Sequence, residues 1–214
     1  MVGLLLLALQ VAGLPNWEGA VQVAEQSVPR VEIQVGDSKG VCSSVVFDID
    51  SEGVASALTA AHCVNHAPTV HMDLTVNGRN ASVVSFNNLL DLAIIQFKPK
   101  HEVAIQLARV SPRAGTEVAV VGFAFGVEDM VAQFGRVAQT LNKETKTLWL
   151  NADLIFGDSG GALININGEL VGINTRIYGQ SVAHLGGAVP VEAVQDYVDD
   201  WRQKVEKEAR KAKK

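Results

Sequence analysis

The sequence predicts an all-β fold in two halves, followed by one terminal helix. Short stretches of the chain alternate between apolar and polar residues at a period of two, as in 31–35 and 117–121. Turn-forming pairs such as Asn77-Gly78 and Asn167-Gly168 separate these stretches. Many short strands at regular spacing are typical of a sandwich or a barrel.

The other expected strands follow the same alternation along the chain. Parts of 41–47, 70–76 and 81–86 carry it in the first half. A Pro-, Ser- and Gly-containing stretch near 108–116 then interrupts the pattern. We therefore expect a first half at about 27–107 and a second half at about 115–190.

The end of the chain has a different period. From Val191 onward, apolar residues recur at helical spacing through Val194, Val198, Trp201 and Val205, which predicts a helix within 191–214. The last part, 201–214, holds seven Lys or Arg and two Glu, so it carries about +5 of charge. We expect this end of the helix to be a solvated basic tail.

Composition limits the class of protein. The chain has 214 residues, of which 48% are hydrophobic and 19% charged, enough to bury a full core. These values exclude a disordered chain, collagen and a disulfide-stapled miniprotein. The formal net charge of −5 argues against nucleic acid as a partner, because binding to phosphates needs a basic face.

The N-terminus is apolar over its first thirteen residues, which is too short to span a bilayer but suits a signal peptide. We expect either a signal peptide within 1–20 or an N-terminal helix docked on the domain, and no stable membrane span. The chain has two cysteines, which could form one disulfide in an oxidising compartment. A secreted or periplasmic location is therefore favoured, with the cytoplasm as the alternative.

The strongest chemical motif is Gly157-Asp158-Ser159-Gly160-Gly161. Flanking glycines leave the Ser159 hydroxyl uncrowded and let backbone N–H groups turn toward one point, as the stabilisation of an oxyanion requires. The string also matches the nucleophile elbow of α/β-hydrolases. That fold needs an acid and then a histidine after the serine, and no histidine follows Asp196, Asp199 or Asp200. The base and the acid are therefore expected upstream.

His62 and Asp91 are the candidates for these two roles. His62 follows small residues that permit close packing at a strand end, whereas the other four histidines have no such setting: His66, His71, His101 and His184. Asp91 lies inside the apolar run 89–95, where a carboxylate is costly unless it is hydrogen-bonded. Its alternative role is to cap a turn after Asn87-Asn88.

A metal site is the alternative to this interpretation. Cys63, His66 and His71 carry thiolate and imidazole groups that suit zinc, but they lack a paired Cys-x-x-Cys or His-x-x-x-His. We therefore expect no metal and no cofactor.

The motifs TAAHC at 59–63, DLAI at 91–94 and GDSGGAL at 157–163 together resemble the chymotrypsin-fold serine proteases. Within that fold, the segments 113–126 and 160–175 are similar to the HtrA/Deg branch. The resemblance covers about 27–198 and implies two packed antiparallel β-barrels, a chymotrypsin-like double barrel.

The resemblance also implies a function. By this resemblance, the chain is expected to be a serine endopeptidase acting on protein or peptide substrates, with His62, Asp91 and Ser159 as catalytic triad. The backbone N–H groups of Gly157, Asp158 and Ser159 would form the oxyanion hole. An inactive protease-fold binding module and a serine esterase on the same fold are the alternatives.

Two departures from the HtrA pattern matter. The first is Asp158, at a position where that branch usually has Asn. The second is Cys42, which lies 21 residues before Cys63. This spacing resembles the trypsin branch, in which a disulfide braces the loop of the catalytic histidine. The segment expected after the domain is too short for a PDZ module. We therefore do not expect the PDZ-based control or the trimer of the HtrA branch in this chain, and no oligomeric state is predicted. In the trypsin branch, the aspartate before the nucleophile pairs with an N-terminus released by cleavage, but no matching activation sequence is evident in this chain. We therefore expect activity without cleavage at Arg30, and another, unidentified hydrogen-bond donor to Asp158.

Specificity is expected from three residues. Asp153 lies six positions before Ser159, where trypsin-like enzymes hold the acid that binds Arg or Lys. Thr175 and Ile177 belong to the strand expected to form the pocket wall. By the resemblance, Ile177 occupies a position at which enzymes with a deep pocket have glycine. We therefore expect a shallow apolar pocket that prefers small or medium aliphatic residues, with a basic preference as the alternative.

Overall fold

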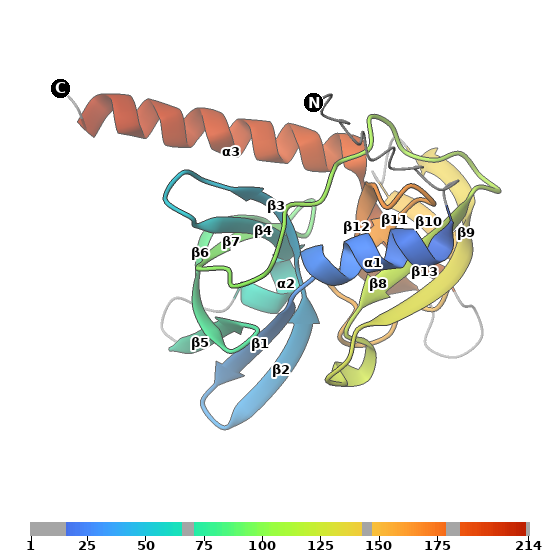
Figure 1. The fold of residues 1–214 in the computed structure, drawn as a ribbon, viewed down its shortest axis with the longest axis horizontal. Coiled ribbons are helices and arrows are strands. Elements are labelled where there is room, and N and C mark those ends of the chain that lie inside the picture. Colours follow the sequence, from blue (N-terminus) through green and yellow to red (C-terminus); the bar gives the residue numbers. More distant parts are fainter. Residues whose placement is uncertain (1–15, 66–70, 143–146, 179–184, 213–214) are drawn as a thin grey trace, which may run out of the picture.

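A computed structural model describes residues 16–65, 71–142, 147–178 and 185–212 of the chain. Two β-sheets lie beside each other, and a long helix at the C-terminus runs across one end of both (Figure 1). The predicted all-β fold with a C-terminal helix is confirmed. The expected signal segment at 1–20 lies mostly outside the described residues.

The first sheet has seven antiparallel strands in the order β2-β1-β5-β6-β7-β4-β3. Their bounds are β1 Arg30–Val35, β2 Ser38–Ser43, β3 Val45–Ile49, β4 Ala55–Ala60, β5 Met72–Val76, β6 Arg79–Asn87 and β7 Leu92–Phe97. Where a closed barrel was expected, this sheet is a half-barrel with β2 and β3 at its edges. The end of β2 is hydrogen-bonded to the second half of the molecule, because the N–H of Ser43 donates to the carbonyl of Ser159 at 2.8 Å.

The second sheet closes into a six-stranded barrel in the order β10-β13-β12-β11-β8-β9. Its strands are β8 Glu117–Gly122, β9 Val131–Asn142, β10 Thr147–Asn151, β11 Ala162–Ile164, β12 Leu170–Tyr178 and β13 Leu185–Pro190. The short 3₁₀ helix η1 Ala124–Gly126 leads from β8 toward β9. All pairings within the barrel are antiparallel.

Three apolar clusters hold the fold together. One fills the first sheet around Val31 and Ile95, and another fills the closed barrel around Leu148 and Leu163. The third joins the two halves, because Leu58 and Ile94 of the first sheet share a cluster with residues of the barrel and of both terminal helices. Burial of this shared surface fixes one half against the other, so loops from both halves can build one rigid site.

Two long helices cover the junction. Helix α1 Trp17–Ser27, which strand periodicity did not predict, begins at Asn16, whose side chain accepts from the N–H of Gly19 at 2.8 Å. It buries Ala20 and Ala24 in the shared cluster. Helix α3 Val191–Ala212 buries its first half, where Val194 and Val198 lie inside, and its end is exposed as expected of a basic tail.

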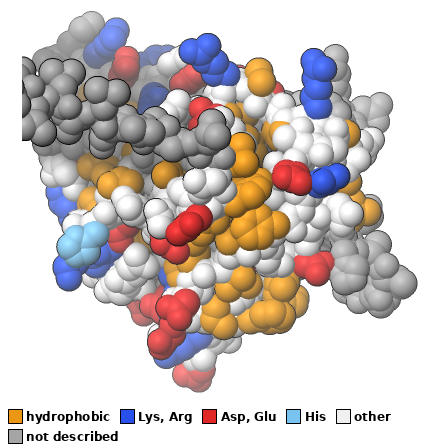
Figure 2. Space-filling view, turned by 45° about the vertical axis from the view of Figure 1, so that its right-hand side comes forward, with side chains coloured by type: hydrophobic (Ala, Val, Ile, Leu, Met, Phe, Trp, Pro, Cys, Tyr) orange, Lys and Arg blue, Asp and Glu red, His pale blue; other side chains and the backbone are white. Residues whose placement is uncertain are grey.

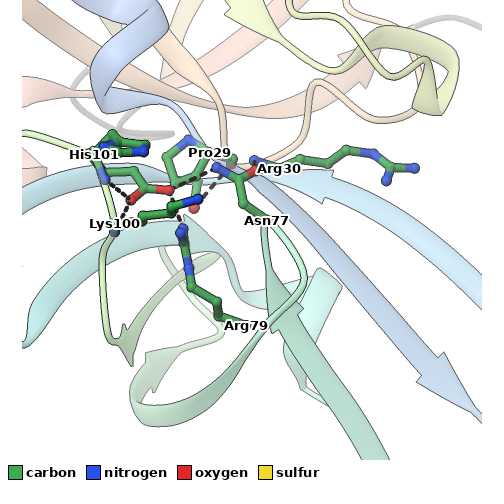
Figure 3. Close-up of polar contacts among 8 residues, drawn as sticks. Pro29, Arg30, Asn77, Arg79, Lys100 and His101 are labelled. Atoms are coloured by element: carbon green, nitrogen blue, oxygen red, sulfur yellow. Dashed lines mark hydrogen bonds and ion pairs between the residues drawn. The ribbon is translucent and has the colours of Figure 1, made fainter.

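The connection between the halves is fastened to the first sheet by one carboxylate. Figure 3 shows Asn77, Arg79, Lys100 and His101 converging on it. The carboxylate belongs to Glu102, which accepts from Asn77 Nδ2 at 2.9 Å, from the backbone of Lys100 at 2.7 Å and of His101 at 3.1 Å, and from Arg79. Burial raises the pKa of Glu102, but these hydrogen bonds outweigh it and lower the pKa from 4.5 to about 2.

Among the described residues, no helix is both long enough and apolar enough to span a membrane.

Candidate active site

His62 and Asp91 form the first part of the candidate site. The buried strand β4 ends at Ala60, and the short helix α2 Ala61–Val64 follows it and places His62 just beyond the end of this strand. His62 Nδ1 lies 2.8 Å from Asp91 Oδ2, and the backbone N–H of His62 donates to Asp91 Oδ1 at 2.9 Å. The carboxylate favours the tautomer that carries its proton on Nδ1, which leaves Nε2 free to accept a proton.

Asp91 is held for this contact by an unusual backbone. Its φ of +56° lies in the left-handed region, and its carbonyl accepts from the N–H of Ala61 at 3.1 Å. The Asp91 side chain is 15% exposed and that of His62 50% exposed. The acid is therefore shielded behind a histidine that faces solvent.

Ser159 lies in the tight loop between β10 and β11. Its carbonyl accepts from Ser43, and the N–H of Gly160 donates to the carbonyl of Asn174 at 2.7 Å. Gly157 has a φ of +102°, and a Cβ there would lie 2.0 Å from the carbonyl oxygen of Phe123. Only glycine fits this position, so the glycine of the motif is required by packing as well as by conformation.

The loop leaves two N–H groups available. Within the described part of the chain, the N–H groups of Gly157 and Ser159 have no hydrogen-bond acceptor. The N–H of Asp158 donates to the carbonyl of Ile155 at 3.0 Å. The expectation that Asp158 contributes to the oxyanion hole is therefore wrong, because its N–H is used to close the turn.

One cavity of about 530 Å³ brings the motifs together: His62 of the first half and Ser159 and Gly157 of the second half all line it. Because these residues come from distant parts of the chain, the cavity depends on the packing of the two halves. A serine hydroxyl, a histidine with a free Nε2 and two free N–H groups are the groups that acyl transfer needs.

Asp158 is buried at 1% exposure beneath this loop. Its Oδ2 accepts from the N–H of Ile155 and from Gln133 Nε2, each at 3.0 Å. Oδ1 has no hydrogen-bond partner. Burial raises the pKa of Asp158 from 3.8 to about 6, although both hydrogen bonds oppose the shift. Gln133 is thus the donor that the sequence did not reveal, since nothing marks it among the polar residues of β9.

Ser43 is a second residue that the sequence analysis missed. Its Oγ donates to the carbonyl of Gly157 at 2.8 Å and accepts from the N–H of Phe123 at 2.9 Å. Thr59 Oγ1 donates to the Ser43 carbonyl at 2.7 Å. These buried bonds tie the Gly157 loop to the first sheet. The only signal in the sequence is a pair of serines directly after Cys42.

The disulfide between Cys42 and Cys63 is present, with an S–S distance of 1.98 Å, and joins β2 to the residue after His62. Of the other histidines, His71 and His101 are exposed, and His71 pairs with Asp73 at 3.1 Å. His66 and His184 lie outside the described residues. No group of three potential metal ligands occurs in the ranges that the structure describes.

The three residues expected to set specificity have different positions. Thr175 lines the cavity, whereas Asp153 is exposed and does not line it. For Ile177 only the backbone is described, opposite Gly186 in the pairing of β12 with β13. Leu154, which was not predicted, packs against that glycine, because a Cβ on Gly186 would lie 2.8 Å from Leu154 Cδ1.

The comparisons with known proteins agree with this geometry. The family model of the trypsin-like peptidase domain matches residues 42–173. The chain belongs to the trypsin-like peptidases. The matched segment of this peptidase domain runs from Cys42 through His62, Asp91 and Ser159 to Ile173, so it contains all three motifs.

The relatives of this peptidase are HtrA-like. The periplasmic serine endoprotease DegP of Escherichia coli K12 is 32% identical over 165 residues, which is 72% of this chain and 34% of the relative. The mouse serine protease HTRA4 is 26% identical over 169 residues, 74% of this chain and 34% of the relative. The chain thus spans about a third of the length of these relatives, and is homologous to their protease domain.

A solved structure supports the fold. The crystal structure of a serine endoprotease from Yersinia pestis matches with a TM-score of 0.71 at 24% identity, over 86% of this chain and 65% of that one. The fold of this trypsin-like peptidase is therefore chymotrypsin-like.

Proposed function

We propose that this chain is a serine endopeptidase in which Ser159 is the nucleophile, His62 the general base and Asp91 its partner. The observation that carries the proposal is the cavity lined by both Ser159 and His62, with the His62 ring hydrogen-bonded to Asp91 at 2.8 Å. Membership of the trypsin-like peptidases and homology to named serine proteases support it.

The chemistry follows from the positions of the protons. Ser159 Oγ attacks the peptide carbonyl while His62 Nε2 takes its proton, and Asp91 stabilises the resulting imidazolium. The N–H groups of Gly157 and Ser159 bind the negative oxygen that forms. His62 then gives the proton to the leaving amine, and a water molecule activated by His62 releases the acyl group from Ser159. No step requires a metal or a cofactor.

The substrates proposed are proteins or peptides with a small or medium aliphatic residue on the acyl side of the scissile bond. Leu154 is 8% exposed and belongs to the core of the barrel, so it fills space beside Gly186 that a deep pocket would need. Asp153, the residue that would favour a basic substrate, is exposed to solvent.

A secreted or periplasmic location is proposed. Three observations support it: the disulfide between Cys42 and Cys63, which persists in oxidising compartments, the apolar stretch at the N-terminus, and relatives named as periplasmic endoproteases.

Labelling with a fluorophosphonate tests the function, because this reagent phosphonylates an activated serine. We expect one adduct on Ser159 by peptide mass spectrometry, together with cleavage of unfolded casein. Ser159→Ala should lose the adduct and about 10⁶-fold in turnover while its melting temperature stays near that of wild type. The matched control is Ser51→Ala, in an exposed turn, which should retain both.

The alternatives give different results in the same experiment. A binding module on this fold would remain unlabelled and leave casein intact. A serine esterase would be labelled and hydrolyse simple esters, but peptide amides would not be turned over.

A further inference from the structure

The Gly157 N–H, one of the two donors proposed for the oxyanion, depends on the orientation of a single peptide group. The carbonyl of Phe156 and the N–H of Gly157 belong to the same planar trans peptide, so they point in opposite directions. The Phe156 carbonyl accepts from the N–H of Phe125 in η1 at 2.6 Å. This bond therefore fixes the direction of the Gly157 N–H, and a shift of η1 would turn that donor away from its place.

The η1 turn is not held in place by its own apolar side chain. Phe125 is 75% exposed and Phe156, which it contacts through the backbone, is 81% exposed. Both belong to the second half, on whose side of the molecule apolar side chains gather at the surface (Figure 2). Phe125 also has a φ of +56°, which bulky residues rarely adopt. Contacts from outside the turn are therefore needed to keep it in this conformation.

One such contact comes from a charged side chain of the first half. Arg30, at the start of β1, donates from Nη2 to the carbonyl of Gly126 in η1 at 3.3 Å, across 96 positions of the chain. Its Nη1 pairs with Glu32, and the other oxygen of Glu32 accepts from Thr75 Oγ1 at 3.3 Å. Glu32 thus orients the guanidinium toward η1, and the donor to Gly126 carries a charge, which strengthens the hydrogen bond.

The backbone of Arg30 is held just as firmly. Its N–H donates to Asn77 Oδ1 at 3.0 Å, and its carbonyl accepts from the N–H of Asn77 at 2.9 Å. Asn77 is in turn bound to the buried carboxylate of Glu102. Figure 3 shows the Arg30 side chain extending away from this cluster. Arg30 therefore reaches η1 from a fixed base in the first half.

The arginine is costly at this position. Its side chain is 23% exposed, and its Nε is buried with no hydrogen-bond partner among the described residues. A buried donor without an acceptor destabilises the folded state, and an apolar side chain would avoid that cost. Stability therefore does not account for Arg30, whereas its contact with η1 does.

We propose that Arg30 is a positioning residue for the oxyanion hole. It fastens η1 to the first half, so that the N–H of Phe125 holds the Phe156–Gly157 peptide with the Gly157 N–H available to the oxyanion. This inference rests on the proposed endopeptidase function. Because the oxyanion exists only after Ser159 has attacked the carbonyl, the contact acts on the transition state and not on substrate binding.

Arg30→Met tests the proposal, because methionine keeps an unbranched apolar stem and removes the guanidinium. We expect kcat on a peptide amide to fall about tenfold to a hundredfold, less than on direct loss of an oxyanion donor, with KM within about twofold of wild type. The melting temperature should not fall. The matched control is Arg136→Met, an exposed arginine of β9 that also pairs with a glutamate, and it should keep wild-type kcat.

A peptide trifluoromethyl ketone measures the oxyanion hole directly. Ser159 Oγ forms a bond to its carbonyl carbon, His62 takes the serine proton, and the carbonyl oxygen becomes an anion at the N–H groups of Gly157 and Ser159. In Arg30→Met we expect the Ki of this inhibitor to rise by about the same factor as kcat falls. A loss of folded protein would lower the amount of active enzyme but leave this Ki unchanged.

The outcomes separate the two proposals. If wild type neither cleaves the peptide nor binds the ketone at Ser159, the proposed function fails and this inference falls with it. If wild type is active and Arg30→Met retains wild-type kcat and Ki, the role of Arg30 is refuted while the function stands. A fall in kcat with an unchanged Ki would also refute it. Should Arg30→Met fail to fold, Glu32→Gln, which removes the charge that orients the guanidinium, should show the same paired change in kcat and Ki at about threefold, and wild-type values there would overturn the proposal.

Discussion

Asp91 binds His62 with both of its carboxylate oxygens, one through the imidazole Nδ1 at 2.8 Å and the other through the backbone N–H at 2.9 Å. A carboxylate held at two points cannot rotate away from the ring without losing a hydrogen bond. The pair therefore fixes the orientation of His62 as well as its tautomer.

Asp91→Asn tests this relationship. The amide oxygen can still accept from the backbone N–H, but the amide nitrogen then donates toward Nδ1 and forces the proton onto Nε2, where it prevents general-base catalysis. We expect kcat on a peptide amide to fall about 10⁴-fold. Asp73→Asn is the matched control, since Asp73 pairs with exposed His71 away from the cavity, and it should retain full activity. An equal loss in both variants would contradict the proposed role.

Gln133→Ala should destabilise the protein in a pH-dependent way. Because burial raises the pKa of Asp158 from 3.8 to about 6, the folded state favours the protonated acid, and stability falls as pH rises through this range. Without Gln133 the buried carboxylate of Asp158 loses a hydrogen-bond donor. When Asp158 is charged, this loss lowers the free energy of unfolding by about 1–3 kcal/mol.

We therefore expect the variant to melt at a clearly lower temperature than wild type at pH 8 and at nearly the same temperature at pH 5. Gln139→Ala, an exposed glutamine on the same strand, serves as the control and should match wild type at both values. A loss of stability that does not depend on pH would mean that Gln133 does not act through the charge of Asp158.

The disulfide should contribute to stability through the loop that it closes. Its cysteines are 21 positions apart, and closing a loop of this size stabilises a fold by about 3 kcal/mol. Replacing both Cys42 and Cys63 with serine should lower the free energy of unfolding in urea by about this amount. Mass spectrometry of the unreduced wild type should find it two hydrogens lighter than after reduction, and two free thiols would refute the bond.

Leu154→Ala tests the expected shape of the acyl-side pocket. Removing this side chain opens space beside Gly186, so kcat/KM for peptides with Phe or Leu before the cut should rise about tenfold relative to Val. Ile166→Ala, a partly exposed aliphatic residue between β11 and β12, is the control and should leave the profile unchanged. A wild-type profile dominated by Arg and Lys, and lost in Asp153→Ser, would show instead that the pocket is basic-specific.

Glu102→Gln should weaken the protein more at neutral pH than in acid. The pKa of Glu102 is lowered from 4.5 to about 2, so its stabilisation is present above pH 4.5 and is lost as pH falls toward 2. Its side chain is only 9% exposed, so we expect a loss of about 2–3 kcal/mol at pH 7. Urea unfolding at pH 7 and pH 3 measures the difference, with exposed Glu128→Gln as the control. Equal losses at both pH values would contradict the mechanism.

The sequence alone determined the class of fold and located the motifs of the candidate site. A period of two is a local property, because alternate side chains of a strand face opposite sides, and it located most of the strands before any pairing was known. The motifs around His62, Asp91 and Ser159 are also local, since each depends on a few neighbouring residues. The local sequence could not predict that the first sheet stays open. Its edge strand β2 is hydrogen-bonded at one end to Ser159 of the other half, and this contact joins distant parts of the chain.

Tertiary structure decided which residues support those motifs. Gln133 reaches Asp158 across 25 positions, and Ser43 reaches Gly157 across 114, so neither contact leaves a pattern in the local sequence. The same holds for the cavity between the halves, which His62 and Ser159 both line because the shared apolar cluster fixes one half against the other. The residue type determines the chemistry of a side chain. The partners of that side chain depend on how distant segments pack to bury apolar surface.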